Sequence, residues 1–137
     1  MSITNRTILV LCDDQIQLHR AFTLAARLVS MSERSYAMFK TSEKLLEKLN
    51  GQNIEAMLID WNLIGSVLQK GELIKELVKR RPDVPVYILS TSDNKKEMQV
   101  AQESGAKGWI VKTSLIMALR RWKMEKDDIP EWHVWRG

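Results

Sequence analysis

The sequence predicts an α/β fold, in which a doubly wound, five-stranded parallel sheet carries helices on both faces. Short apolar runs alternate with longer amphipathic segments along the chain. The short runs are apolar almost throughout, which is typical of strands that are covered on both faces in a parallel sheet. A length of 137 residues is enough for one domain with a core and leaves little room for a second.

The five predicted strands are short runs rich in apolar and β-branched residues. Each is bounded by polar or turn-forming residues and is too short for an ordinary buried helix. The runs are TILVLC (7–12), SYAMFK (35–40), IEAMLI (54–59), VPVYIL (84–89) and GWIV (108–111).

Each strand is followed by a segment whose apolar residues have helical spacing, and this alternation predicts parallel strands joined by helices. One helix begins after Thr41 or Ser42, because either side chain can cap an N-terminus, and it ends before Gly51. The other predicted helices cover 15–31, 71–81, 94–104 and 114–125.

Composition indicates a cytoplasmic globular protein. Hydrophobic residues make up 45% of the chain and charged residues 28%, which is ordinary for this class. No apolar run approaches membrane-spanning length, and the polar start MSITNRT lacks a signal-peptide core. The single cysteine, Cys12, excludes a disulfide framework. The net charge of +4 comes partly from clusters at 79–81 and 120–123, which we interpret as solvated helix faces; nucleic-acid binding is not expected for this chain alone.

Polar side chains follow four of the predicted strands, at the point where each strand ends. Asp13 and Asp14 follow the first strand, Asp60 the third, Ser90 the fourth and Lys112 the fifth. In open parallel sheets, ligands bind outside the carboxyl ends of the strands. We therefore expect three carboxylates, a hydroxyl group and an ammonium group at one edge of the sheet.

Such a cluster of carboxylates requires compensating positive charge. Two carboxylates about 5 Å apart repel each other by roughly 3 kcal/mol at an effective dielectric constant near 20. Oxygen ligands with open positions suit Mg²⁺, and an ammonium and a hydroxyl group beside them would cradle a phosphoryl group carried by a carboxylate. Asp13 and Asp14 can alternatively cap the following helix, although capping does not explain Asp60.

The chain resembles the receiver domain of two-component response regulators. The residues that carry the resemblance are the acidic pair Asp13–Asp14, Asp60, Ser90 and Lys112, which follows GAKGWIV. The resemblance covers about residues 6–125. It implies a flavodoxin-like (βα)5 receiver fold, with the receiver domain over residues 1–125 and a C-terminal tail over residues 126–137.

The resemblance also implies roles for individual residues. Asp60 would accept the phosphoryl group, and Ser90 and Lys112 would contact that group. The resemblance implies a Mg²⁺ site formed by Asp14, Asp60 and the main-chain carbonyl of Asn62, with Asp13 contributing through water. A receiver domain catalyses its own phosphorylation and dephosphorylation and is not otherwise an enzyme.

Signal output would depend on Trp109, which occupies the family's switch-aromatic position, usually Tyr or Phe. The helix at 94–104, the strand at 108–111 and the helix at 114–125 would form a face whose preference for a downstream protein changes on phosphorylation. The phosphodonor would be a histidine kinase or a histidine phosphotransfer protein. No membrane partner is implied.

The chain departs from the family pattern at several positions. Thr113 stands where Pro usually follows the lysine, Thr91 where Ala or Gly is commoner, and Ile64 where Pro is frequent. The loop at 62–71 is longer than usual, and Trp109 is bulkier than Tyr. These departures favour one alternative, a receiver-like module that binds its partner without phosphorylation. A second alternative also stays open: the chain is the regulatory domain of a longer DNA-binding or enzymatic protein.

The sequence also predicts where three further tryptophans lie. Trp61, next to Asp60, is expected to be a partly exposed loop residue. In the tail, Trp132 and Trp135 are expected to dock on the protein's own surface, with anchoring of a partner as the alternative.

Overall fold

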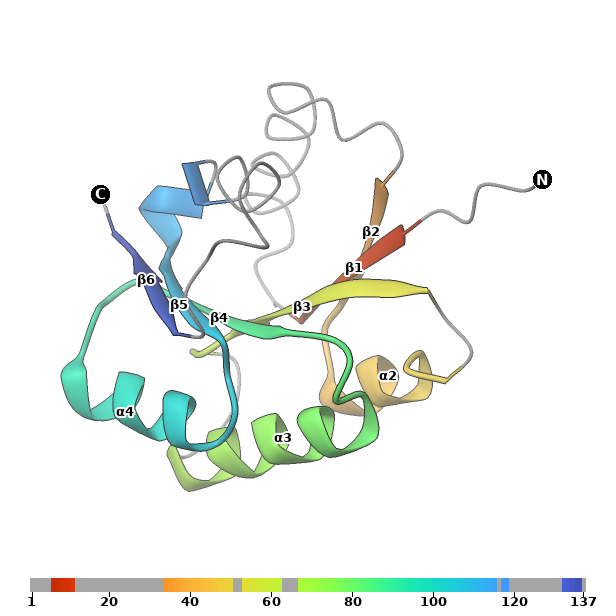
Figure 1. Ribbon diagram of the computed structural model, residues 1–137, viewed down its shortest axis with the longest axis horizontal. Helices are drawn as coiled ribbons and strands as arrows, with labels where there is room; N and C mark the ends of the chain where they lie inside the picture. The colour runs from red at the N-terminus through yellow and green to blue at the C-terminus, as the bar shows by residue number, and fades with distance from the viewer. Residues whose placement is uncertain are drawn as a thin grey trace.

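The computed structural model describes residues 6–11, 34–50, 53–62, 67–115, 117–118 and 132–136. Within these ranges the chain forms one parallel sheet with the strand order β2-β1-β3-β4-β5-β6 (Figure 1). The strands are β1 (Arg6–Leu11), β2 (Arg34–Phe39), β3 (Ile54–Asp60), β4 (Val86–Ser90), β5 (Gly108–Val111) and β6 (His133–Trp135). The first five confirm the predicted five-stranded parallel sheet, and β6 adds a strand from the tail.

The strand order reverses at β1, which lies between β2 and β3. Leu11, the last residue of β1, is paired with both Phe39 and Ile59. Asp60 follows Ile59 and is itself paired with Leu89 of β4. The carboxyl ends of the central strands therefore lie side by side at the position where α/β sheets bind ligands.

Three helices are described: α2 (Ser42–Glu47), α3 (Val67–Arg80) and α4 (Lys95–Glu103), together with the 3₁₀-helix η1 (Lys112–Ser114). The predicted capping of α2 is confirmed, because the Thr41 hydroxyl accepts a hydrogen bond from the Lys44 N–H at 3.3 Å. The start predicted for α3 is wrong by four residues: α3 begins at Val67, so much of the loop that looked long is helix.

The remaining predicted helices fall largely outside the described residues. The segment at 15–31 lies wholly outside them. Of the segment at 114–125, Leu115, Met117 and Ala118 have helical backbone. No helix among the described residues is long and apolar enough to cross a membrane.

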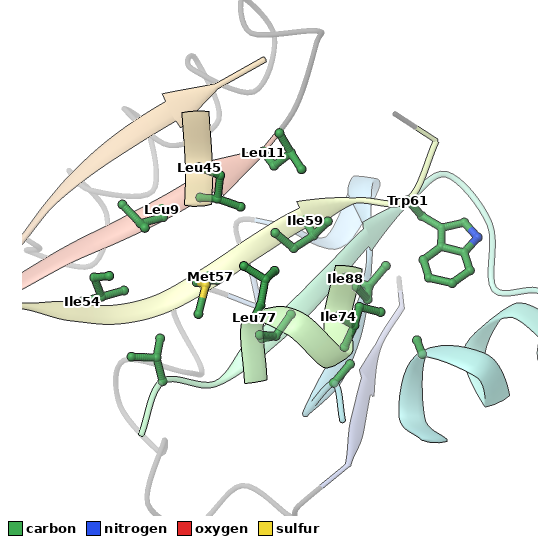
Figure 2. Packing of buried hydrophobic residues seen from close by; sticks show 14 of the residues in the cluster. Leu9, Leu11, Leu45, Ile54, Met57, Ile59, Trp61, Ile74, Leu77 and Ile88 are labelled. Atoms are coloured by element: carbon green, nitrogen blue, oxygen red, sulfur yellow. The ribbon is translucent and has the colours of Figure 1, made fainter. Parts of the chain in front are cut away.

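The helices α2, α3 and α4 cover one face of the sheet (Figure 1). Successive strand residues point to opposite faces, so every second residue of a strand enters the core beneath these helices. On α3, Ile74 and Leu77 are fully buried against this face, one turn of helix apart. Figure 2 shows the cluster, which includes Leu9, Leu11, Leu45, Met57, Ile59 and Ile88.

The tail pairs in parallel with β5, with Trp109 opposite Val134 and Ile110 opposite Trp135. Trp135 is 6% exposed, and its ring packs edge-on against Tyr87 at a centroid distance of 5.7 Å. Trp132 is partly buried against the core. Both tail tryptophans thus dock on the protein's own surface, as expected.

Candidate functional site

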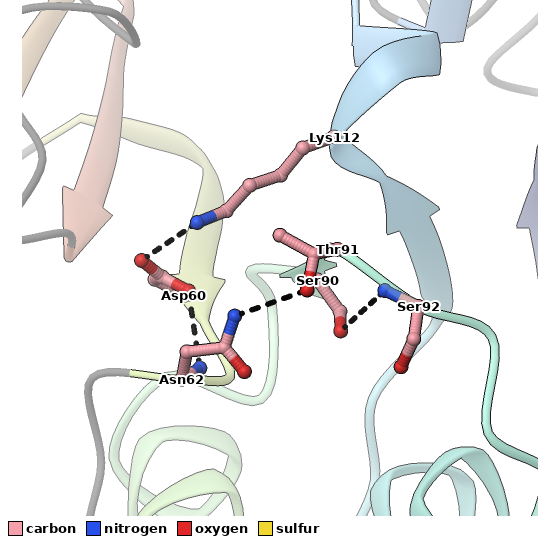
Figure 3. A network of polar contacts seen from close by, with 6 residues as sticks. All are labelled: Asp60, Asn62, Ser90, Thr91, Ser92 and Lys112. Atoms are coloured by element: carbon pink, nitrogen blue, oxygen red, sulfur yellow. Dashed lines mark hydrogen bonds and ion pairs between the residues drawn. The ribbon is translucent and has the colours of Figure 1, made fainter.

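The centre of the site is Asp60, the last residue of β3, whose side chain is 1% exposed. Its Oδ2 accepts a hydrogen bond from the Lys112 Nζ at 3.0 Å, and its Oδ1 accepts one from the Asn62 N–H at 3.1 Å (Figure 3). The hydrogen bonding between β3 and β4 continues one residue beyond Asp60, because the Trp61 N–H donates to the Leu89 carbonyl at 2.7 Å. Asp60 is thus fixed by backbone on both sides.

Lys112 reaches Asp60 from the start of η1, immediately after β5. The ammonium group is the fixed positive charge that the sequence predicted for this edge. Removing two charges from water costs about as much as their attraction returns, so such a pair is weak evidence of a purely stabilising role. Its position at a sheet switch point favours a role in binding or chemistry.

The loop after β4 forms the other side of the site. Ser90 ends β4, is buried, and its hydroxyl oxygen accepts a hydrogen bond from the Ser92 N–H at 3.2 Å. Figure 3 shows this hydroxyl turned toward Ser92 rather than toward Asp60. The Asn62 Nδ2 donates to the Thr91 Oγ1 at 3.4 Å, which links the loops after β3 and β4.

Trp109 of β5 contacts this loop and is fully buried, at 0% exposure. Its indole N–H donates to the Ser92 carbonyl at 2.8 Å, and its ring centroid lies 5.2 Å from that of Trp61. The residue predicted as the switch aromatic is therefore attached directly to the loop that begins after Ser90.

The expectation that Trp61 is partly exposed is wrong, because Trp61 is fully buried. It follows Asp60 on the helix-covered face, where α3 packs over it and the Lys70 ammonium lies 4.8 Å from its ring centroid. Lys70 was not predicted to lie near the site, because the sequence pattern placed it in the loop at 62–71. Lys70 precedes Ile74 by four residues and Leu77 by seven, which is helical spacing and could have placed Lys70 in the helix.

Two of the predicted metal ligands, Asp13 and Asp14, lie outside the described residues. Within the described part of the chain, no group of three His, Cys, Asp or Glu side chains gathers as a metal site. The other two predicted ligands, Asp60 and Asn62, lie within the described residues and are in contact. Asp60 is a buried carboxylate, and the main chain of Asn62 turns back beside it. The Asp60 carboxylate fits Mg²⁺, which prefers oxygen ligands, whereas the Asn62 main chain presents its N–H to that carboxylate.

The response regulator receiver domain profile matches residues 8–121 of this sequence. The chain belongs to the response regulator receiver domain family. Receiver domains are signalling modules and not classical enzymes.

Solved receiver structures share the fold. A CheY-like receiver domain protein from Methanospirillum hungatei JF-1 is 18% identical, with a TM-score of 0.70 and coverage of 91% of this chain and 95% of that chain. The chemotaxis response regulator CheY4 of Vibrio cholerae is 18% identical, with a TM-score of 0.68 and coverage of 88% of this chain and 98% of that chain. The isolated receiver domain of RcsB from Salmonella enterica, solved in the presence of the phosphomimetic BeF3−, is 14% identical. Its TM-score is 0.73, and the match covers 95% of this chain and 94% of that chain.

Identities this low demonstrate the fold alone. No curated protein sequence matches this receiver domain significantly.

One departure from the family pattern is settled by the geometry. The described residues contain no cis peptide bond, so the Lys112–Thr113 bond is trans. Lys112 still reaches Asp60 from this backbone. The proline that usually follows the lysine is therefore not needed here to bring the ammonium group to the carboxylate. Ile64 lies outside the described residues.

Proposed function

We propose that this receiver domain accepts a phosphoryl group on Asp60 from a histidine kinase or a histidine phosphotransfer protein, with Mg²⁺ as cofactor. The observation that carries the proposal is a buried carboxylate, at the carboxyl end of a central strand, held 3.0 Å from the ammonium group of Lys112. Charge compensation and fixed position are what phosphoryl transfer asks of a protein.

In the proposed reaction, a carboxylate oxygen of Asp60 attacks phosphorus. The phosphorus–nitrogen bond of the donor's phosphohistidine breaks, and the imidazole leaves with the bonding electron pair. The product is an acyl phosphate with three strong acceptor oxygens. Lys112 offers an ammonium group to those oxygens, and Ser90 offers a hydroxyl group once it turns from Ser92.

Asp13, Asp14, Asp60 and the main-chain carbonyl of Asn62 would hold the Mg²⁺. When bound, the ion supplies charge neutralisation for the carboxylates and the transferred group. The output would pass through Trp109 to a downstream protein that binds the face around α4 and β5. We assign the receiver domain to residues 1–125, the tail to residues 126–137, and the setting to the cytoplasm.

Mass spectrometry of the intact protein tests this proposal. The protein is incubated with Mg²⁺ and a small acyl phosphate beside a known receiver domain, with Asp60→Asn as the matched variant. We expect the wild-type protein to gain one phosphoryl group and the variant to gain none. The proposal fails if the known receiver is modified and the wild-type protein is not, or if Asp60→Asn is modified equally.

A second candidate function is a receiver-like module that binds its partner independently of phosphorylation. Trp109 favours it, because complete burial and a hydrogen bond to the Ser92 carbonyl leave this ring little freedom to switch. A partner that binds wild type and Asp60→Asn with equal affinity, in the presence and absence of phosphodonor, would support this candidate over the first.

A further inference from the structure

The C-terminal strand β6 is fastened to the rest of the protein beyond its pairing with β5. The His133 N–H donates to the Lys107 carbonyl at 3.2 Å, just before β5 begins. At the other end, the Arg136 Nη1 lies 2.8 Å from the Asp93 Oδ2, an exposed ion pair across 43 residues of sequence. Asp93 belongs to the loop between β4 and α4, so β6 joins that loop to the edge of the sheet.

The edge of β5 is shaped for β6. A Cβ atom added at Gly108 would lie 2.7 Å from the His133 carbonyl oxygen, 2.8 Å from the Trp135 ring and 3.0 Å from the Tyr87 ring. The first of these contacts is with backbone, which cannot turn aside as a side chain can. The missing side chain at Gly108 is thus what lets the two strands approach.

Two contacts connect docked β6 to the loop after Ser90. The first is the ion pair between Arg136 and Asp93. The second runs through Trp109, which is paired with Val134 of β6 and donates to the Ser92 carbonyl. These two contacts are made at consecutive residues of the loop, Ser92 and Asp93.

In this arrangement the Ser90 hydroxyl oxygen accepts from the Ser92 N–H and is turned away from Asp60 (Figure 3). A phosphoryl group on Asp60 would draw the hydroxyl toward itself. The hydroxyl would then leave the Ser92 N–H, and the backbone at Ser92 would have to find another acceptor or move. Movement of this loop strains the same two contacts that hold β6.

We propose that β6 is an intramolecular latch: docked β6 favours the arrangement in which Ser90 faces Ser92, and a phosphoryl group on Asp60 favours release of β6. This inference rests on the proposed phosphorylation of Asp60. Linkage is reciprocal: if a phosphoryl group on Asp60 weakens the docking of β6 by some factor, docked β6 weakens binding at Asp60 by the same factor, and a variant that weakens docking relieves part of that effect. Release would leave unpaired N–H and C=O groups along β5, which an extended segment of a partner can pair.

Two variants weaken the latch by independent means. Gly108→Ala displaces β6 through the backbone contact, and Arg136→Ala removes an exposed ion pair without affecting the core. The exchange Asp93→Arg with Arg136→Asp restores the pair with reversed charges. Arg80→Ala is the matched control, because Arg80 forms an exposed ion pair with Glu76 on α3.

The experiment measures the apparent affinity for beryllofluoride at fixed Mg²⁺ by fluorine NMR, and hydrogen exchange of residues 132–136 in the full chain. We expect Arg136→Ala to bind about two- to fivefold more tightly, since exposed pairs contribute little. Gly108→Ala should bind at least about tenfold more tightly, within the usual range of coupling. The charge exchange and Arg80→Ala should match wild type. Beryllofluoride should speed exchange in β6 of wild type.

Unchanged or weaker affinity in Arg136→Ala overturns the latch, as does β6 exchange that beryllofluoride leaves unaltered. Arg136→Ala decides the matter even if Gly108→Ala fails to fold, because its side chain is exposed. Failure of wild type to bind beryllofluoride is a different result: it overturns the proposed phosphorylation of Asp60, and the coupling with it.

Discussion

Removal of Lys112 should destabilise the protein in a way that depends on the charge of Asp60. The two side-chain atoms lie 3.0 Å apart, and unit charges at this distance attract each other by roughly 5 kcal/mol at an effective dielectric constant near 20. Lys112 is 26% exposed, so water screens it and the attraction is smaller. Loss of one partner of a buried pair typically costs about 3–5 kcal/mol. We take the lower end for Lys112→Met.

The opposite substitution should behave differently. Asp60→Asn keeps the shape of the side chain and removes its charge, and the Lys112 ammonium group left behind is 26% exposed and can be solvated by water. The free energy of unfolding should therefore change by less than about 1 kcal/mol. In the double variant neither position 60 nor position 112 carries a charge, and the cost of Lys112→Met should largely disappear. The coupling energy between the two positions should therefore be about 2–3 kcal/mol.

Urea unfolding of the four proteins at neutral pH, in the presence of a chelator, measures this cycle. Added Mg²⁺ should restore part of the stability of Lys112→Met but have little effect on the double variant. Lys75→Met is the control, since Lys75 forms an exposed pair with Glu72 at 3.8 Å and should matter by less than about 0.5 kcal/mol. Additivity of the two substitutions to within about 0.5 kcal/mol would refute the argument.

Three further predictions concern the core, a helix cap and access to the site. Leu77→Ala should lower the free energy of unfolding by about 2–5 kcal/mol, because Leu77 is fully buried. Met117→Ala is the control and should cost less than about 0.5 kcal/mol, because the Met117 side chain is 66% exposed. Equal effects of the two substitutions in urea unfolding would contradict the packing. Thr41→Ala should cost about 0.5–2 kcal/mol, and a neutral result in the same assay would contradict the cap. Thr91→Ala removes the hydroxyl that Asn62 contacts and should speed phosphorylation by a small acyl phosphate; a slower initial rate would show that Thr91 does not restrict access.

The convergence of Asp60, Ser90 and Lys112 was predictable from sequence for a simple reason. Each residue ends a strand or follows one directly, and parallel strands in one sheet end at the same edge. Once the apolar runs are identified, the topology brings these side chains together without further information. The lysine side chain is long enough to reach across this edge, and its Nζ lies 3.0 Å from the Asp60 Oδ2 in the structure.

The burial of Trp61 and the position of Lys70 were not predictable in the same way. Gly71 disfavours a helix interior, so the sequence pattern placed the helix start there. In the structure Gly71 lies inside α3, and a Cβ atom at this position would lie 2.9 Å from the Ser104 hydroxyl just after α4. Tertiary packing between α3 and α4 thus accounts for the glycine, and it brings Lys70 over Trp61.

The strand state of β6 is a second feature that local sequence does not determine. Three residues, His133–Trp135, are too few for a periodic pattern to be detected. The segment is a strand because the edge of β5 offers unpaired backbone groups and because Gly108 leaves space for it. Both conditions are set by residues distant in sequence.

A crystal structure with Mg²⁺ and beryllofluoride tests the central claim most directly. We expect beryllium bonded to a carboxylate oxygen of Asp60, with Lys112 and the Ser90 hydroxyl contacting fluorine and a metal ion beside Asp60. A structure from crystals grown with both reagents in excess, in which the Lys112–Asp60 pair is unchanged and beryllofluoride is bound elsewhere, would contradict the account.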